Sequence, residues 1–220
     1  MSKNKLVIIH TTSITVEPLK RLAIETIPDV QIINLVDDSI LPQLAANGGR
    51  IEGIQDRWRE YALIAEKQDA ACILNACSSI GELCALVQPD INVPIVRIDD
   101  AMASYAIRAA DVIGVAATLA TTMNPTLRML RGKAKELGKS VELVTEVASS
   151  AYQKLIDGDK EGHDEELAAV LRGLAKRSEI VVLAQASMAS VLTRFTPDER
   201  ERFLTSPALA MANVKSIMTR

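Results

Sequence analysis

The sequence predicts an α/β fold of two pseudo-symmetric lobes, each a mainly parallel sheet flanked by helices, with the site in the cleft between them. Three observations support this prediction. Short apolar runs alternate with longer amphipathic runs along all 220 residues, which is typical of strands separated by helices. No stretch rich in Ser, Gly or Pro interrupts the alternation. In each half of the chain, two apolar strands end in small or hydroxyl residues.

Strands are predicted where short runs of apolar, often β-branched residues stand together, at residues 6–9, 30–35, 71–74, 95–96, 112–116, 140–144 and 180–184. Between them, apolar residues recur at helical spacing, which predicts helices at 16–24, 54–67, 79–87, 102–108, 125–137 and 165–176. We expect lobe 1 to comprise residues 1–97, with residues 208–220 returning to it. Residues 98–207 would then form lobe 2.

Composition excludes several classes of protein. A net charge of −3, with both signs scattered along the chain, leaves no basic stripe for nucleic acid or an anionic membrane. The apolar run after Lys5 is too short for a signal peptide, and no run approaches the roughly 20 apolar residues of a membrane span. The three cysteines fit neither the paired spacing of a metal site nor a disulfide framework. We therefore expect a cytoplasmic protein without a metal site.

Cys77 is the best candidate for chemistry. It lies between a predicted strand and a predicted helix, where unpaired backbone N–H groups and the helix dipole favour an anion. A thiol in that place is a candidate for a lowered pKa, and the thiolate is the nucleophilic form. The alternative is that Cys77 is a small buried hydrophobe, which is what we expect of Cys72 and Cys84.

The halves of the chain align with each other at their strand ends. Residues 7–12 match 113–118, and residues 73–78 match 182–187, so that Cys77 corresponds to Ala186 in this repeat. Ligands of open α/β sheets bind beyond the carboxyl ends of the strands, and we expect the site there. Ordinary repetition of strand and helix would give a similar pattern.

Three motifs resemble those of the aspartate/glutamate/hydantoin racemase superfamily, which also includes arylmalonate decarboxylase and maleate isomerase. Asn75-Ala76-Cys77-Ser78-Ser79 resembles the first catalytic motif, Ala-Cys-Asn-Thr. Residues 117–122 are similar to the Thr-x-x-Thr turn, and residues 184–189 to the hydantoin-racemase form Gly-Cys-Ala-Gly-Met-Ala. The resemblance covers nearly the whole chain, and it implies a homodimer and a small carboxylate substrate.

The resemblance also implies a mechanism that needs no cofactor or metal. A cysteine thiolate removes the proton next to a carboxylate, and a second cysteine delivers a proton to the opposite face. The developing charge needs donors placed in advance. The implied substrate-binding residues are Thr11, Thr12, Ser78, Ser79, Thr118, Thr121, Thr122, Ala186 and Ser187. A role as helix N-cap would explain each hydroxyl equally well.

The second catalytic cysteine of the family is absent, and Gln185 takes its place in the comparison with hydantoin racemases. The implied catalytic positions are thus Cys77, His10 and Gln185. His10 follows the first strand and could activate Cys77 or shuttle a proton, or else be a polar strand-end residue. His163 lies in the acidic segment 159–166, and we expect it to be exposed and without a role.

The leading hypothesis is a racemase-type or isomerase-type enzyme that transfers a proton at the α-carbon of a small amino acid or related acid, using Cys77. The alternatives are a single-thiol decarboxylase, a cis-trans isomerase of a small dicarboxylate, and a non-catalytic carboxylate-binding protein. The Asp37-Asp38 and Asp99-Asp100 pairs are adjacent in sequence, so we expect them to cap turns or helices rather than to act as paired carboxylates.

Overall fold

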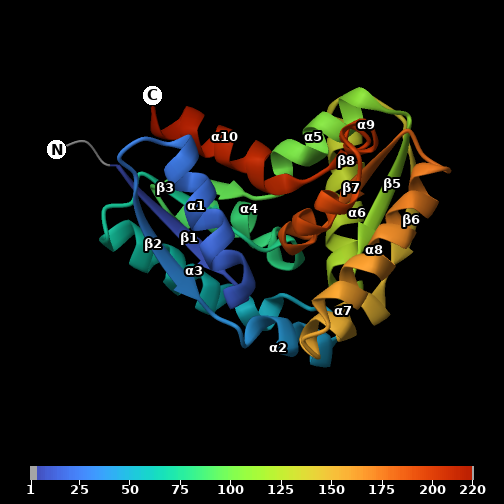
Figure 1. Cartoon of the computed structure of the whole chain (residues 1–220). Coiled ribbons are helices and arrows are strands. Elements are labelled where there is room, and N and C mark those ends of the chain that lie inside the picture. The colour runs from blue at the N-terminus through green and yellow to red at the C-terminus, as the bar shows by residue number, and fades with distance from the viewer. Residues whose placement is uncertain (1–3, 220) are drawn as a thin grey trace. The chain divides into compact units, whose positions relative to one another are not determined.

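The computed structural model describes residues 4–219, and the chain divides into two compact units. Unit 1 runs as far as Asp99 and resumes at Pro207, and unit 2 comprises Asp100–Ser206. Each unit contains a four-stranded sheet whose paired strands are all parallel, with helices packed against it (Figure 1). The predicted α/β class with two mainly parallel sheets is therefore confirmed.

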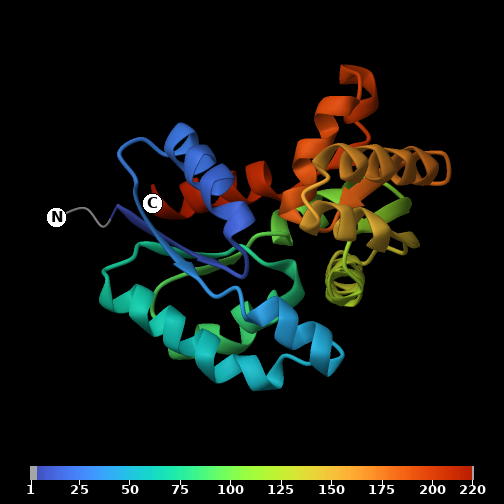
Figure 2. The same cartoon turned by 60° about the horizontal axis from the view of Figure 1, so that its bottom comes forward.

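Unit 1 has the strand order β2-β1-β3-β4. The strands are β1 (Lys5–His10), β2 (Gln31–Val36), β3 (Cys72–Asn75) and β4 (Ile95–Arg97). The helices are α1 (Val16–Thr26), α2 (Ile40–Asn47), α3 (Glu52–Lys67), α4 (Leu83–Val87) and the C-terminal α10 (Ser206–Met218). In Figure 2, α1 (blue) and α10 (red) cover one face of this sheet, and α3 (teal) covers the other.

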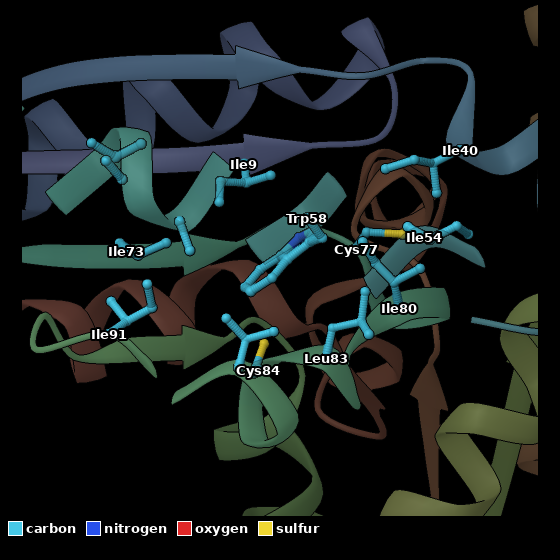
Figure 3. Packing of buried hydrophobic residues seen from close by; sticks show 14 of the residues in the cluster. Ile9, Ile40, Ile54, Trp58, Ile73, Cys77, Ile80, Leu83, Cys84 and Ile91 are labelled. Carbon is cyan, nitrogen blue, oxygen red and sulfur yellow. The ribbon is translucent and has the colours of Figure 1, made fainter. Parts of the chain in front are cut away.

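Alternation along β1 and β3 sends side chains to both faces of the sheet, and both faces are buried. Ile9 and Ile73 pack toward α3, where they contact a cluster built around Trp58, which is 0% exposed. Cys77 and Cys84 belong to this same cluster, as Figure 3 shows. The end of β3 therefore lies on a buried, apolar cluster.

Unit 2 repeats this topology with the order β6-β5-β7-β8. Its strands are β5 (Val112–Ala117), β6 (Glu142–Val147), β7 (Ile180–Leu183) and β8 (Phe203–Leu204). Its helices are α5 (Asp100–Ala109), α6 (Ala120–Glu136), α7 (Ser149–Ile156), α8 (Lys160–Ala175) and the short α9 (Pro197–Arg200). Leu167, Leu171 and Leu174 of α8 pack against Val181 and Leu183 of β7.

Several elements were not predicted from the sequence, namely α2, α7, α9, α10 and β8. The segment Asn47-Gly48-Gly49 ends α2, and Gly48 caps that helix in the left-handed conformation at φ 73°. The helix predicted over residues 79–87 is split into a 3-10 turn, Ser78–Ile80, and α4.

The prediction that His163 is exposed was wrong. This side chain is 3% exposed, and its Nδ1 lies 2.9 Å from the carbonyl oxygen of Ala151. Because α7 packs on α8, the acidic segment around His163 is covered on one side. Within residues 4–219, no helix is long and apolar enough to cross a membrane.

Candidate active site

The two units end their central strands with matching backbone hydrogen bonds. In unit 1, the Ala76 N–H donates to the Ile9 carbonyl oxygen at 2.9 Å. In unit 2, the Ala184 N–H donates to the Ala116 carbonyl oxygen, also at 2.9 Å. Ala76 is therefore the structural counterpart of Ala184, and Ile9 is the counterpart of Ala116.

Counting onward from these positions pairs the candidate site residues. Thr11 corresponds to Thr118, and Cys77 corresponds to Gln185. The repeat alignment from sequence, which matched Cys77 with Ala186, was wrong by one residue. The backbone supports the new pairing, because both residues are extended and each precedes a 3-10 segment, with φ −130° and ψ 115° at Cys77 and φ −122° and ψ 135° at Gln185.

Four hydrogen-bonding groups converge on the sulfur of Cys77. They are the hydroxyl groups of Thr11 and Ser79 and the backbone N–H groups of Ser79 and Ile80. Thr11 reaches the sulfur because β1 and β3 are neighbours, while the other donors come from the 3-10 turn that follows Cys77. All four donors favour the thiolate.

Burial nevertheless dominates the titration of this thiol. Cys77 is 7% exposed, and desolvation raises its pKa despite the opposing hydrogen bonds. The expectation of a lowered pKa was therefore wrong in direction. Cys72 and Cys84 are buried as predicted, and burial raises the pKa of each to about 12. Only Cys77 has such a set of donors from the strand end.

The turn after Cys77 is supported by residues that the sequence did not single out for the site. Arg97, at the end of β4, donates to both carboxylate oxygens of Asp99, from Nε at 2.6 Å and from Nη2 at 3.1 Å. Asp99 is 0% exposed. A Cβ on Gly81 would lie 2.8 Å from Nη2 of Arg97, so the guanidinium lies across this glycine. The residue at position 81 must therefore be small unless Arg97 moves.

Asn75 supports the same turn from the other side. Its Nδ2 donates to the carbonyl oxygen of Cys77 at 2.9 Å, and its side chain is 0% exposed. One signal in the sequence could have identified Asn75: it is a polar residue that ends an apolar strand directly before the small-residue motif.

In unit 2, the corresponding threonine donates its hydrogen bonds to a side-chain amide, which does not titrate. Thr118 donates to Oε1 of Gln185 twice, from its backbone N–H at 2.6 Å and from its hydroxyl at 3.0 Å. The structure thus brings these two predicted residues together. A carboxamide neither accepts nor releases a proton near neutral pH, so this pair can bind and orient but cannot act as an acid or base.

Both ring nitrogens of His10 hydrogen-bond residues other than Cys77. Its Nδ1 lies 2.8 Å from Oγ1 of Thr15, and its Nε2 lies 2.9 Å from Oδ1 of Asn34. The amide oxygen can only accept, so Nε2 carries a proton. Burial lowers the pKa of His10, although the bond to Asn34 opposes the change. Both ring nitrogens are thereby engaged on the face of β1 that Ile9 does not occupy.

The remaining predicted residues have mixed environments. Thr12 acts as an N-cap, because its hydroxyl accepts from the Ile14 N–H at 3.4 Å. Thr122 is 1% exposed, and its carbonyl oxygen accepts from the Thr126 hydroxyl at 2.9 Å. Ser78 is buried, whereas three others are only partly buried: Thr121, Ala186 and Ser187.

The paired aspartates do not form carboxylate sites. Asp37 accepts from Ser39 and Tyr61 and forms an ion pair with Arg57 at 3.1 Å, while Asp99 is held by Arg97. No group of three or more His, Cys, Asp or Glu side chains in residues 4–219 is arranged to hold a metal ion.

Comparisons with known proteins identify the family of the chain. The chain matches the Asp/Glu/Hydantoin racemase family over residues 6–214. Among curated proteins, no sequence matches the chain.

Solved structures share the fold at low sequence identity. Glutamate racemase isoform RacE1 from Bacillus anthracis is 14% identical with a TM-score of 0.76, over 100% of this chain and 83% of that one. Aspartate racemase from Picrophilus torridus is 15% identical with a TM-score of 0.72, over 97% and 94%. Allantoin racemase from Klebsiella pneumoniae is 15% identical with a TM-score of 0.64, over 98% and 87%.

The solved structures show the shared fold, and the family match extends over nearly all of both units. Together they support a racemase-type or isomerase-type enzyme. The chain belongs to the Asp/Glu/hydantoin racemase family.

Proposed function

We propose that the protein transfers a proton at the carbon next to the carboxylate of a small amino acid or related acid, with Cys77 as acid and base and without a cofactor or metal. The observation that carries the proposal is the convergence of four donors on the sulfur of Cys77 at the end of β3. A sulfur that served only as a small hydrophobe would not need these donors.

The chemical step is a reversible proton transfer. The Cys77 thiolate takes the α-proton, the C–H bond breaks, and its electron pair moves into the carboxylate to give an enediolate. The new S–H group then returns a proton to carbon, and in deuterated water it can first exchange with solvent. General acid–base catalysis of this kind contributes about 10²- to 10⁴-fold to a rate.

The counterpart position in unit 2 does not offer a second acid/base group. Gln185 stands where the family resemblance implies a second cysteine, and its amide oxygen is already bound by Thr118. A carboxamide cannot supply a proton near neutral pH. We therefore expect hydrogen exchange at the α-carbon with retention of configuration, rather than efficient racemisation by two thiols.

One further candidate function is favoured by the titration of Cys77. Because burial raises the pKa of this thiol, its neutral form is the resting form at neutral pH. A neutral thiol is the form needed to protonate an enediolate left by loss of carbon dioxide from a substituted malonate. Single-thiol decarboxylation is thus the second candidate.

The test follows the α-hydrogen directly. The protein is incubated in deuterated water with small amino acids, hydantoins and substituted malonates, while deuterium uptake, optical rotation and carbon dioxide release are measured. The variants are Cys77→Ala and, as a matched control, Cys72→Ala, which removes another buried thiol of the same segment. We expect exchange without inversion for the wild type and for Cys72→Ala, and none for Cys77→Ala.

Other outcomes would change the assignment. Exchange with inversion would show that another group protonates the second face. Carbon dioxide release that depends on Cys77 would establish the decarboxylase. Turnover that survives in Cys77→Ala would contradict the proposed role of the thiol. Ligand binding without any turnover across the panel would favour a carboxylate-binding protein.

A further inference from the structure

Asn75 is a polar residue in a place that the fold fills with an apolar one elsewhere. It is the last residue of β3, and its side chain is 0% exposed. The matching backbone bonds make Leu183, the last residue of β7, its counterpart in unit 2. Leu183 is also 0% exposed. The strand end can therefore be built around an aliphatic side chain, and the amide in unit 1 needs another explanation.

The amide group of Asn75 joins two parts of the site. Nδ2 donates to the Cys77 carbonyl oxygen at 2.9 Å, and the same side chain hydrogen-bonds the sulfur of Cys84 on α4. Its Oδ1 is buried without a hydrogen-bond partner in the described residues. A buried acceptor without a partner costs free energy. The two contacts made by the amide nitrogen must offset that cost.

The bond to the Cys77 carbonyl has a geometric consequence. It fixes the peptide plane that follows Cys77, and so holds ψ at 115°. That plane sets the start of the 3-10 turn, which supplies the N–H groups of Ser79 and Ile80 to the Cys77 sulfur. Without the hydrogen bond from Asn75, the Cys77 carbonyl can rotate, and the N–H groups of Ser79 and Ile80 no longer point at the sulfur.

We infer that Asn75 is a positioning residue for the Cys77 thiol: it locks the Cys77 carbonyl so that the following turn presents its N–H groups to the sulfur. The inference rests on the proposed function, because it assigns a role within that site. Asn75 acts through the backbone of Cys77. The sulfur of Cys84 is the second anchor of the amide and not a second reactive group, since burial raises its pKa to about 12.

The test measures Cys77 itself and needs no substrate. Alkylation of the full-length protein by iodoacetamide is followed at Cys77 by peptide mass spectrometry between about pH 7 and 11, a range in which the buried Cys72 and Cys84 stay mostly protonated. The pH midpoint reports thiolate stabilisation, while a change in access only scales the whole curve. The main variant is Asn75→Leu, which installs the residue of unit 2. Asn75→Ala is used alongside it in case the larger side chain prevents folding.

We expect either Asn75 variant to raise the alkylation midpoint by about one pH unit, equivalent to about tenfold slower reaction at a fixed pH. Cys84→Ala removes only the second anchor of the Asn75 amide. The alkylation midpoint of Cys77 in this variant should equal that of the wild type. A folded Asn75 variant whose midpoint coincides with that of the wild type would overturn the inference. The alkylation midpoint is measured without substrate. The inference about Asn75 can therefore be tested even if the activity assay of the proposed function fails.

Discussion

The strand ends of the two units share a backbone and differ in chemistry. Both place a threonine after one central strand and an extended residue after the next, and both continue into a 3-10 segment. In unit 1 the threonine donates to a thiol, and in unit 2 it donates to an amide. The comparison teaches that the repeated fold provides donors at each strand end, while a single side chain decides whether the donors meet a titratable group.

The largest expected effect tests this asymmetry directly. Cys77→Ala should lower α-hydrogen exchange by about 10²- to 10⁴-fold, because it removes the acid/base group. Gln185→Met keeps a similar volume but removes the acceptor for Thr118, and we expect its activity to fall by no more than about tenfold. Steady-state deuterium uptake measures both. Equal losses of activity in the two variants would contradict this asymmetry, because they would show that Gln185 contributes as much to the reaction as Cys77.

The next test concerns the turn after the central residue. Counting from Cys77 and Gln185, Gly81 has Ala189 as its counterpart. Gly81→Ala should destabilise the protein by about 1–3 kcal/mol, because the new Cβ would overlap the Arg97 guanidinium that is paired with buried Asp99. Denaturant unfolding gives the free energy of unfolding.

Gly132→Ala is the matched control for that variant. Gly132 lies in α6, and apart from the neighbouring backbone of its own helix no atom lies within 4 Å of an added Cβ, so alanine should stabilise the helix by about 0.5–1 kcal/mol. A neutral or stabilising Gly81→Ala would mean that Arg97 moves aside readily, and that the turn in unit 1 is no more constrained than that in unit 2.

A smaller effect is the pH dependence of stability that His10 contributes. Its counterpart at the end of β5, Ala117, cannot titrate. Burial lowers the pKa of His10, so between its folded and unfolded pKa values only the unfolded state binds the proton. The stability it contributes is present above the unfolded pKa, near 6.5, and is lost as pH falls, at no more than about 1.4 kcal/mol per pH unit. Urea unfolding from pH 7.5 to 5 should show this loss, and His10→Gln should lack it. Parallel curves for the two proteins would contradict the assignment.

The smallest effect comes from the two threonines. Thr11→Val removes one donor to the Cys77 sulfur and should raise its alkylation midpoint by less than about one pH unit. Thr118→Val removes one of the two bonds to Gln185 and should leave the Cys77 midpoint unchanged. A shift in Thr118→Val as large as that in Thr11→Val would show that the two strand ends are coupled rather than independent.

Local patterns made much of the fold predictable. The β-branched runs at residues 6–9 and 112–116 overlap β1 and β5, because buried parallel strands read as continuous apolar segments. Helix α10 was missed as a helix, although its segment was expected to return to lobe 1. Helix α7 has only eight residues, too few to be stable alone, and packing on α8 stabilises it.

The candidate site was only partly predictable. The motif around Cys77 could be recognised from small residues after an apolar run, and Thr118 and Gln185, two residues that the resemblance implied for the site, hydrogen-bond each other. The register of the repeat, the direction of the pKa shift at Cys77 and the roles of Asn75 and Arg97 could not be predicted. Each depends on which strands are neighbours and on how deeply the sulfur is buried.

The sequence by itself determined the α/β class, the order of the central strands along the chain, and the presence of glutamine at position 185, where the family resemblance implies a second catalytic cysteine. These are properties of local periodicity and of residue identity. Only the tertiary structure decided that Cys77 is the counterpart of Gln185, that burial outweighs four donors at the sulfur, and that His10 bonds Asn34 and Thr15. The physical reason is that desolvation and hydrogen bonding act between segments far apart in the chain, and their balance is set by three-dimensional packing.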